Sequence, residues 1–231
     1  MAFEGFDRGA IELLRKLPDW DTNTYSAEKT RLKQGLVEPG GALIEAVAEA
    51  LDADLSVVRR SSVSPLHRDL RFAPAGAARY KDHLLLTTWN GSDKKFAPTL
   101  WIRIDADRVG FASGLAFDPK QRDRWRDAVG GKAGEGLARA IRKVELGARK
   151  HFVEVAGDAL KQVPAPWEAD HPRADLLRMK GFQIRFAEPL PRNVEKPAFV
   201  GWCATRLRRL LPIHNWLVNE LAKPMARGRR R

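Results

Sequence analysis

The residues best suited to chemistry lie near the centre of the chain, in the segment His67–Phe72 and in the pair Tyr80–Lys81. If the first segment is a strand, Asp69 and Arg71 project to one face and Arg68 to the other. An Asp and an Arg two residues apart can form a local ion pair and present a guanidinium to a phosphate or carboxylate. We therefore predict an anion-binding site formed by Arg68, Asp69, Arg71, Tyr80 and Lys81.

Two other interpretations of this segment stay open. It can be an internal polar clamp, in which Asp69 accepts hydrogen bonds from neighbouring backbone or from an arginine while Phe72 packs in the core. It can also belong to an enzyme acting on a phosphorylated or carboxylated small molecule, with Asp69, His171 or Tyr80 transferring protons. An enzyme would gather these groups in an enclosed pocket, whereas a clamp would satisfy its donors internally.

A second candidate lies in the late segment Asp170–Lys180. His171 directly follows Asp170, so a carboxylate can polarise its imidazole, and we include His171 among the predicted anion-binding residues. The structural alternative is that Asp170 or His171 caps a short helix with Pro172 in its first turn.

Metal and cofactor sites are not indicated. The five histidines lack the two-His helical spacing of zinc sites, and Cys203 is the single cysteine, so we predict no metal site. The glycine-rich segment 130–136 lacks the Gly-Lys-Ser/Thr ending of a phosphate loop, and we expect no cofactor. The free cysteine is expected in the core.

The chain is strongly basic, because its 231 residues include 41 Lys and Arg against 29 Asp and Glu, a formal charge of +12. Residues 206–231 hold eight of the basic residues and one acid, Glu220. Such segments attract phosphates through counterion release, although they can also serve only solubility. We predict nucleic acid or an anionic small molecule as the partner, with a nucleic-acid-binding tail of Arg227, Arg229, Arg230 and Arg231.

Hydropathy and the N-terminal sequence bear on compartment. The apolar stretches fall far short of the roughly 18 residues that a membrane span needs, so we expect no membrane partner. Residues 1–7 are neither basic nor followed by a continuous apolar run, which argues against a secretory signal. We expect a cytoplasmic protein.

The elements that must position these residues begin with a helical N-terminal third. A first helix ends at Pro18, and a second begins near Ser26 with a break or kink at 39–41. From about residue 57 short apolar runs indicate strands, including 57–58 and 70–72. The clearest run, 100–104, alternates in period two and pairs through a turn at 105–107 with 109–114.

The second half of the chain mixes helices and strands. Asp118 and Pro119 begin a helix that ends at Gly130, strands are favoured within 152–163 and at 182–186, and a long helix is expected over 198–221. We predict the α+β class: a single domain over residues 1–222, with an antiparallel sheet covered by helices, and a disordered basic tail over 223–231.

Several stretches resemble a mainly bacterial family called domain of unknown function 2461. In chain order they are Phe3–Phe6, Arg68–Phe72 with Tyr80–His83, and Asp170–Phe182, which together span most of the chain. The resemblance implies a bacterial protein but no mechanism. Two family positions differ here: Pro65 stands at an Arg position, and 75–78 lacks an Asp/Asn-Lys pair. If those positions bind an anion, this chain has lost part of the site.

Overall fold

The computed structural model describes residues 2–147 and 153–222, which divide into two compact units. Unit 1 comprises Met1–Thr88, Trp101–Phe111 and Ala187–Leu207. Unit 2 comprises Trp89–Leu100, Ala112–Phe186 and Arg208–Arg231. Both units are discontinuous in sequence, and four strands, β1, β2, β3 and β5, contribute residues to both of them.

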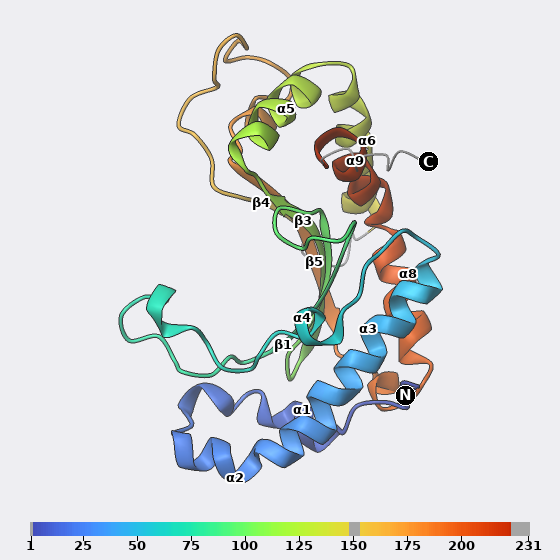
Figure 1. Ribbon diagram of the computed structural model, residues 1–231. Helices are drawn as coiled ribbons and strands as arrows, with labels where there is room; N and C mark the ends of the chain where they lie inside the picture. Colours follow the sequence, from blue (N-terminus) through green and yellow to red (C-terminus); the bar gives the residue numbers. More distant parts are fainter. Residues whose placement is uncertain (1, 148–152, 223–231) are drawn as a thin grey trace, which may run out of the picture. The chain divides into compact units, whose positions relative to one another are not determined.

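One antiparallel five-stranded sheet has the order β1-β2-β3-β5-β4. The strands are β1 (Leu84–Trp89), β2 (Thr99–Ile104), β3 (Arg108–Ala116), β4 (Val153–Ala156) and β5 (Gly181–Pro189) (Figure 1). Leu100, Ile102 and Ile104 of β2 are fully buried, while Arg103 between them is exposed. The predicted alternation of β2, its turn into β3, and the α+β fold class are confirmed.

Unit 1 begins with helices whose starts follow from their caps. Asp7 accepts a hydrogen bond from Gly9 N before α1 (Arg8–Leu13), and Pro18 lies in the short η1 (Leu17–Asp19). Asp21 accepts from Thr24 N and starts α2 (Thr22–Leu32), so the expected start near Ser26 was four residues late. The side-chain oxygen of an Asp satisfies an amide that the helix leaves open.

The expected break at 39–41 is also wrong. A π-helical segment η2 (Lys33–Val37) joins α2 to α3 (Glu38–Leu51), and Pro39 lies in the first turn of α3. There the missing proline N–H costs nothing. A Cβ on Gly40 would lie 3.0 Å from the side chains of Leu84 and Leu86, so glycine permits close packing of α3 on β1. Unit 1 also contains α4 (Arg59–Ser62) and η4 (Arg192–Glu195), with most of α8 (Phe199–Arg208).

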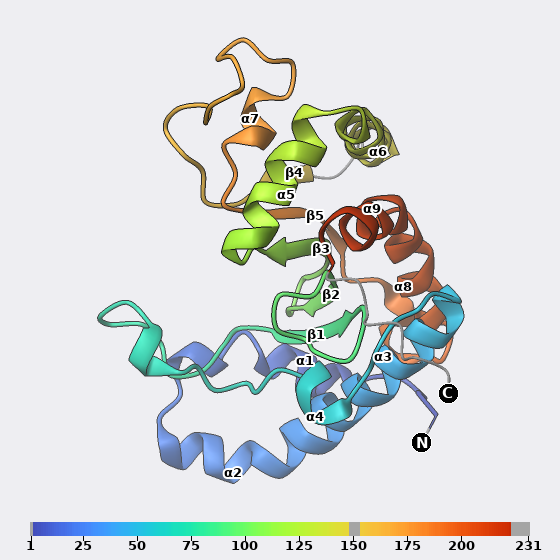
Figure 2. The same ribbon diagram turned by 45° about the horizontal axis from the view of Figure 1, so that its top comes forward.

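Unit 2 contains α5 (Pro119–Gly130), α6 (Ala133–Gly147), α7 (Ala174–Leu177) and α9 (Leu211–Leu221) (Figure 2). Asp118 and Gln121 form a complete capping box at the start of α5, as its sequence predicted in part. Trp125 is fully buried, and its indole N–H donates to the carbonyl of Leu176 at 2.7 Å. Its ring contacts Phe117, Phe182 and Trp216, which makes it the centre of this core.

Several other predicted elements were wrong. The long C-terminal helix is two helices, α8 and α9, because Pro212 cannot continue an earlier helix and instead occupies the first turn of a new one. Residues 57–58 form no strand, and within the described part of 152–163 only Val153–Ala156 does. Cys203 is fully buried, as predicted. No helix in the described part of the chain is long and apolar enough to span a membrane.

His214 of α9 makes the stability of unit 2 depend on pH. The residue is 2% exposed, and neither ring nitrogen makes a well-formed hydrogen bond to a described residue. Burial lowers its pKa to about 4 from 6.5, although the backbone of Thr99 slightly favours the charged form.

We expect stability to fall as the pH drops from about 6.5 to about 4, by up to roughly 3 kcal/mol, because only the unfolded chain takes up this proton. Urea unfolding of the wild type and His214→Leu across this range measures the effect. Identical pH dependence in the two proteins would contradict it.

Candidate functional site

The candidate residues of the central motif lie on one hairpin, residues 63–83, which we call the central hairpin. His67 and Tyr80 form an antiparallel bridge, with Arg68 N donating to Arg79 O and Lys81 N donating to Leu66 O, both at 2.8 Å. A second bridge, Val63 to Leu86, joins the hairpin to β1. In both ribbon views the hairpin runs beside α2 (Figures 1 and 2).

Register places three cations on the same face of this hairpin. Because His67 and Tyr80 lie opposite each other, Arg68, Arg79 and Lys81, one step away, project to the other face. Arg68 Nε donates to Ala78 O at 3.2 Å, and Lys81 Nζ donates to Pro65 O at 2.8 Å. Both side chains are thus positioned by neutral carbonyls.

No described carboxylate forms a salt bridge with these three cations. The other described ion pairs of unit 1 involve different arginines and lysines. Partial burial, together with the positive charge of Arg68, lowers the pKa of Lys81. The face therefore holds mutually repelling positive charges, an arrangement that a bound anion would stabilise.

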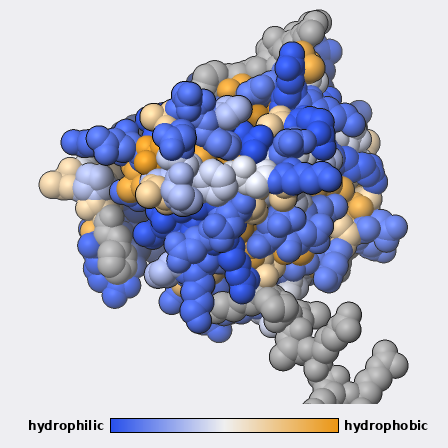
Figure 3. Space-filling model, turned by 90° about the horizontal axis from the view of Figure 1, so that it is seen from above, coloured by the Kyte–Doolittle hydropathy of each residue, from blue (hydrophilic) through white to orange (hydrophobic). Residues whose placement is uncertain are grey.

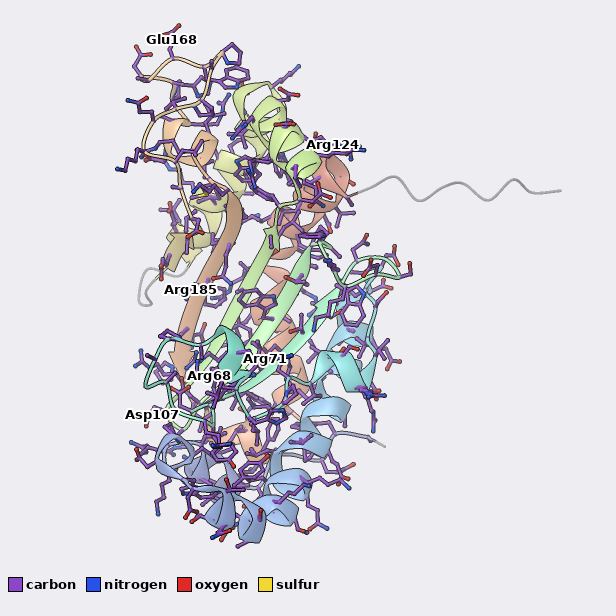
Figure 4. All side chains as sticks on the ribbon, turned by 60° about the vertical axis from the view of Figure 1, so that its left-hand side comes forward. Arg68, Arg71, Asp107, Arg124, Glu168 and Arg185 are labelled. Atoms are coloured by element: carbon purple, nitrogen blue, oxygen red, sulfur yellow. The ribbon has the colours of Figure 1, made fainter. Side chains whose placement is uncertain are left out.

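Asp69 and Arg71 are paired with each other, at the far end of the hairpin. The predicted strand over 67–72 is wrong, because Asp69 caps a short 3-10 turn, η3 (Leu70–Phe72). Its carboxylate accepts Arg71 Nε at 3.0 Å and Nη2 at 2.7 Å, and these bonds lower the pKa of Asp69. Asp often bonds to nearby backbone in this way, in competition with regular structure. Figure 4 labels Arg68 and Arg71 on this hairpin.

This pairing weakens Asp69 as a proton acceptor, because an ionised, hydrogen-bonded carboxylate of low pKa is a poor base. The side chain of Phe72 lies outside the described part, so its predicted packing stays a prediction.

Tyr80 is buried and stacks on Tyr25 of α2. The ring centroids are 4.2 Å apart, with an interplanar angle of 5°. Burial raises the pKa of Tyr25, and the nearby Tyr80 raises it further. Tyr25 was not among the site residues predicted from the sequence, although Tyr25 and Tyr80 are the two tyrosines of the chain. Tyr80 thus anchors the hairpin to α2 rather than standing open for proton transfer.

A charged cluster follows directly after Lys81, and sequence reasoning missed it as well. Asp82 Oδ1 lies 2.6 Å from His83 Nδ1 and accepts Arg103 Nη2 of β2 at 3.1 Å. Arg103 Nε also lies 3.9 Å from Asp105. Two features of the sequence could have indicated this cluster: the adjacent pair Asp82–His83, and the outward-facing Arg103 in the alternating strand β2.

His171 belongs to unit 2, whereas the other five predicted site residues belong to unit 1. Its Nδ1 accepts the Arg173 amide at 3.0 Å, and its ring meets that of Trp167 edge to face. The predicted cap is wrong, because α7 begins at Ala174 with Arg173 as its N-cap residue. Arg173 is held by the carbonyls of residues 129–131, which fixes the chain there.

The predicted tail residues Arg227, Arg229, Arg230 and Arg231 lie outside the described residues. The hollows of the described residues include one of about 230 Å³ against residues 90–98 and an open groove of about 740 Å³ between α6, β4 and α7, both in unit 2. Neither is lined by a predicted site residue. Residues 2–147 and 153–222 contain no cluster of three His, Cys, Asp or Glu side chains placed to hold a metal ion.

Comparison with known families gives one match. Residues 10–216 match the family described as conserved hypothetical protein (DUF2461), which covers most of the chain. No curated protein matches the sequence.

The stacked tyrosines should be energetically coupled. In a double-mutant cycle of Tyr25→Leu and Tyr80→Leu, we expect a coupling energy of about 1 kcal/mol, because an aromatic pair contributes beyond the area it buries. Chemical denaturation of the four proteins measures it. Strictly additive losses would show that the stack does not anchor the hairpin.

Proposed function

Since the chain belongs to the DUF2461 family of conserved hypothetical proteins, whose description states no activity, we propose a function from its own residues: the central hairpin binds an anionic group, foremost a phosphate. The observation that carries this proposal is the set of three cations, Arg68, Arg79 and Lys81, on one hairpin face without a described acidic partner. Like charges facing each other across paired strands are destabilising unless they are neutralised.

The charge of the whole chain supports a second, longer-range contribution. The segments of unit 1 contain 17 Lys and Arg and 17 Asp and Glu, so the net charge of +12 resides in the segments of unit 2. Hydrophilic side chains dominate the face seen in Figure 3. A polyanion would be attracted by this net charge, while the hairpin, in a neutral unit, would bind one anionic group locally.

The partner is a nucleic acid or a phosphorylated small molecule, which share the phosphate group. A single cysteine in the chain is consistent with a reducing compartment, and we propose a cytoplasmic location. The alternative of an enzyme with Asp69, His171 or Tyr80 in proton transfer stays a prediction. The geometry of these three residues does not favour it.

Phosphate binding is expected to depend on the hairpin cations. The double variant Arg68→Met, Lys81→Met should lose about tenfold or more in affinity for inorganic phosphate at low salt, because each tenfold step is about 1.4 kcal/mol. Calorimetric titration measures this. The double variant Lys16→Met, Arg60→Met is the matched control, since it removes two exposed cations of unit 1 from outside the hairpin. Equal affinity in all variants would refute the proposal.

Short RNA and DNA distinguish the two sources of phosphate. Changing Arg227, Arg229, Arg230 and Arg231 to Gln should weaken oligonucleotide binding uniformly and flatten its salt dependence, since fewer counterions are released. If nucleic acid is the partner, the hairpin double variant should lose further affinity in fluorescence anisotropy over about 50–200 mM salt. Loss of phosphate binding with unchanged oligonucleotide binding would identify a small phosphorylated ligand instead.

A further inference from the structure

The Asp82–His83 pair has the geometry of an oriented imidazole at the end of the central hairpin. Asp82 Oδ1 lies 2.6 Å from His83 Nδ1 and is also bound by Arg103 from β2 at 3.1 Å. The Asp82 carboxylate therefore has hydrogen-bond partners on two sides. Because it accepts a hydrogen bond from the His83 ring, it fixes the orientation of that ring. The side chain of His83 is only 15% exposed.

The hydrogen bond determines which nitrogen of His83 can take a proton. With Nδ1–H donating to the carboxylate, the lone pair of the neutral ring is on Nε2. Within the described residues, Nε2 has no hydrogen-bond partner. His83 is consequently a proton acceptor whose orientation is set by Asp82.

The charges around His83 link it to the hairpin cations. Burial lowers the pKa of His83, the hydrogen bond and charge of Asp82 oppose this, and Arg103 and Lys81 lower it further. Lys81 in turn feels the charge of Arg68. An anion bound by Arg68 and Lys81 would offset the repulsion that keeps the imidazole neutral, and by reciprocity a protonated His83 would strengthen anion binding.

We propose that His83 takes up a proton when Arg68 and Lys81 bind an anion, so that the site selects a doubly charged tetrahedral oxoanion, such as a phosphate monoester, over a carboxylate. This inference rests on the proposed function, because it adds the proton and the ligand class to the same site. The three cations of the hairpin face together with an imidazolium favour an anion of two negative charges over an anion of one.

Sulfate is the suitable probe, since it stays doubly charged throughout the pH range in which histidine titrates. In calorimetry we expect sulfate affinity to rise severalfold, at most about tenfold per pH unit, between about pH 7.5 and 5.5. Acetate should bind more weakly at every pH. Calorimetric titrations of the wild type with sulfate in two buffers of different ionisation enthalpy should reveal proton uptake on binding. This measurement requires no variant.

His83→Gln should abolish the pH dependence, whereas the control His67→Gln, which removes an exposed histidine on the same hairpin, should retain it. Pronounced sulfate binding without proton uptake, or with unchanged pH dependence in His83→Gln, would overturn this inference and leave the anion site standing. Sulfate binding that Arg68→Met, Lys81→Met does not weaken would instead overturn the proposed function itself.

Discussion

The pairing of His67 with Tyr80 is the constraint on which the candidate site depends. Two backbone hydrogen bonds fix the register of the central hairpin, and the stack of Tyr80 on Tyr25 holds it against α2. Because side chains alternate between the faces of paired strands, this register alone gathers Arg68, Arg79 and Lys81 on one face. A shift of the register by one residue would place Arg68 on the opposite face from Arg79 and Lys81.

The hairpin contains two arginines that look equivalent in the sequence but have different partners. Arg71 forms a two-point ion pair with Asp69 and is locally neutralised. Arg68 donates to a backbone carbonyl, which positions its guanidinium without neutralising it. The physical difference is the partner: a carboxylate cancels the charge, whereas a carbonyl leaves it available to an anion.

The local rules of the chain predicted much of the fold correctly. The capping pair Asp118–Pro119, the alternation of β2 and the apolar positions of β5 all act within a few residues, so the sequence reveals them directly. The errors arose where a neighbour in space or an unrecognised cap decided the outcome. The π turn before Pro39 accommodates a proline expected to break the helix, and Pro212 begins a helix where continuity was expected.

The sequence by itself determined the basic charge, the α+β class and the residues of the central motif, because composition and short-range patterns are properties of the chain alone. Only the tertiary structure decided which of those residues act together. It buried Tyr80 against a tyrosine 55 residues away and brought Arg103 of β2 to Asp82, 21 residues earlier in the chain. These contacts join segments distant in sequence, and their energies depend on burial and register, which no local pattern encodes.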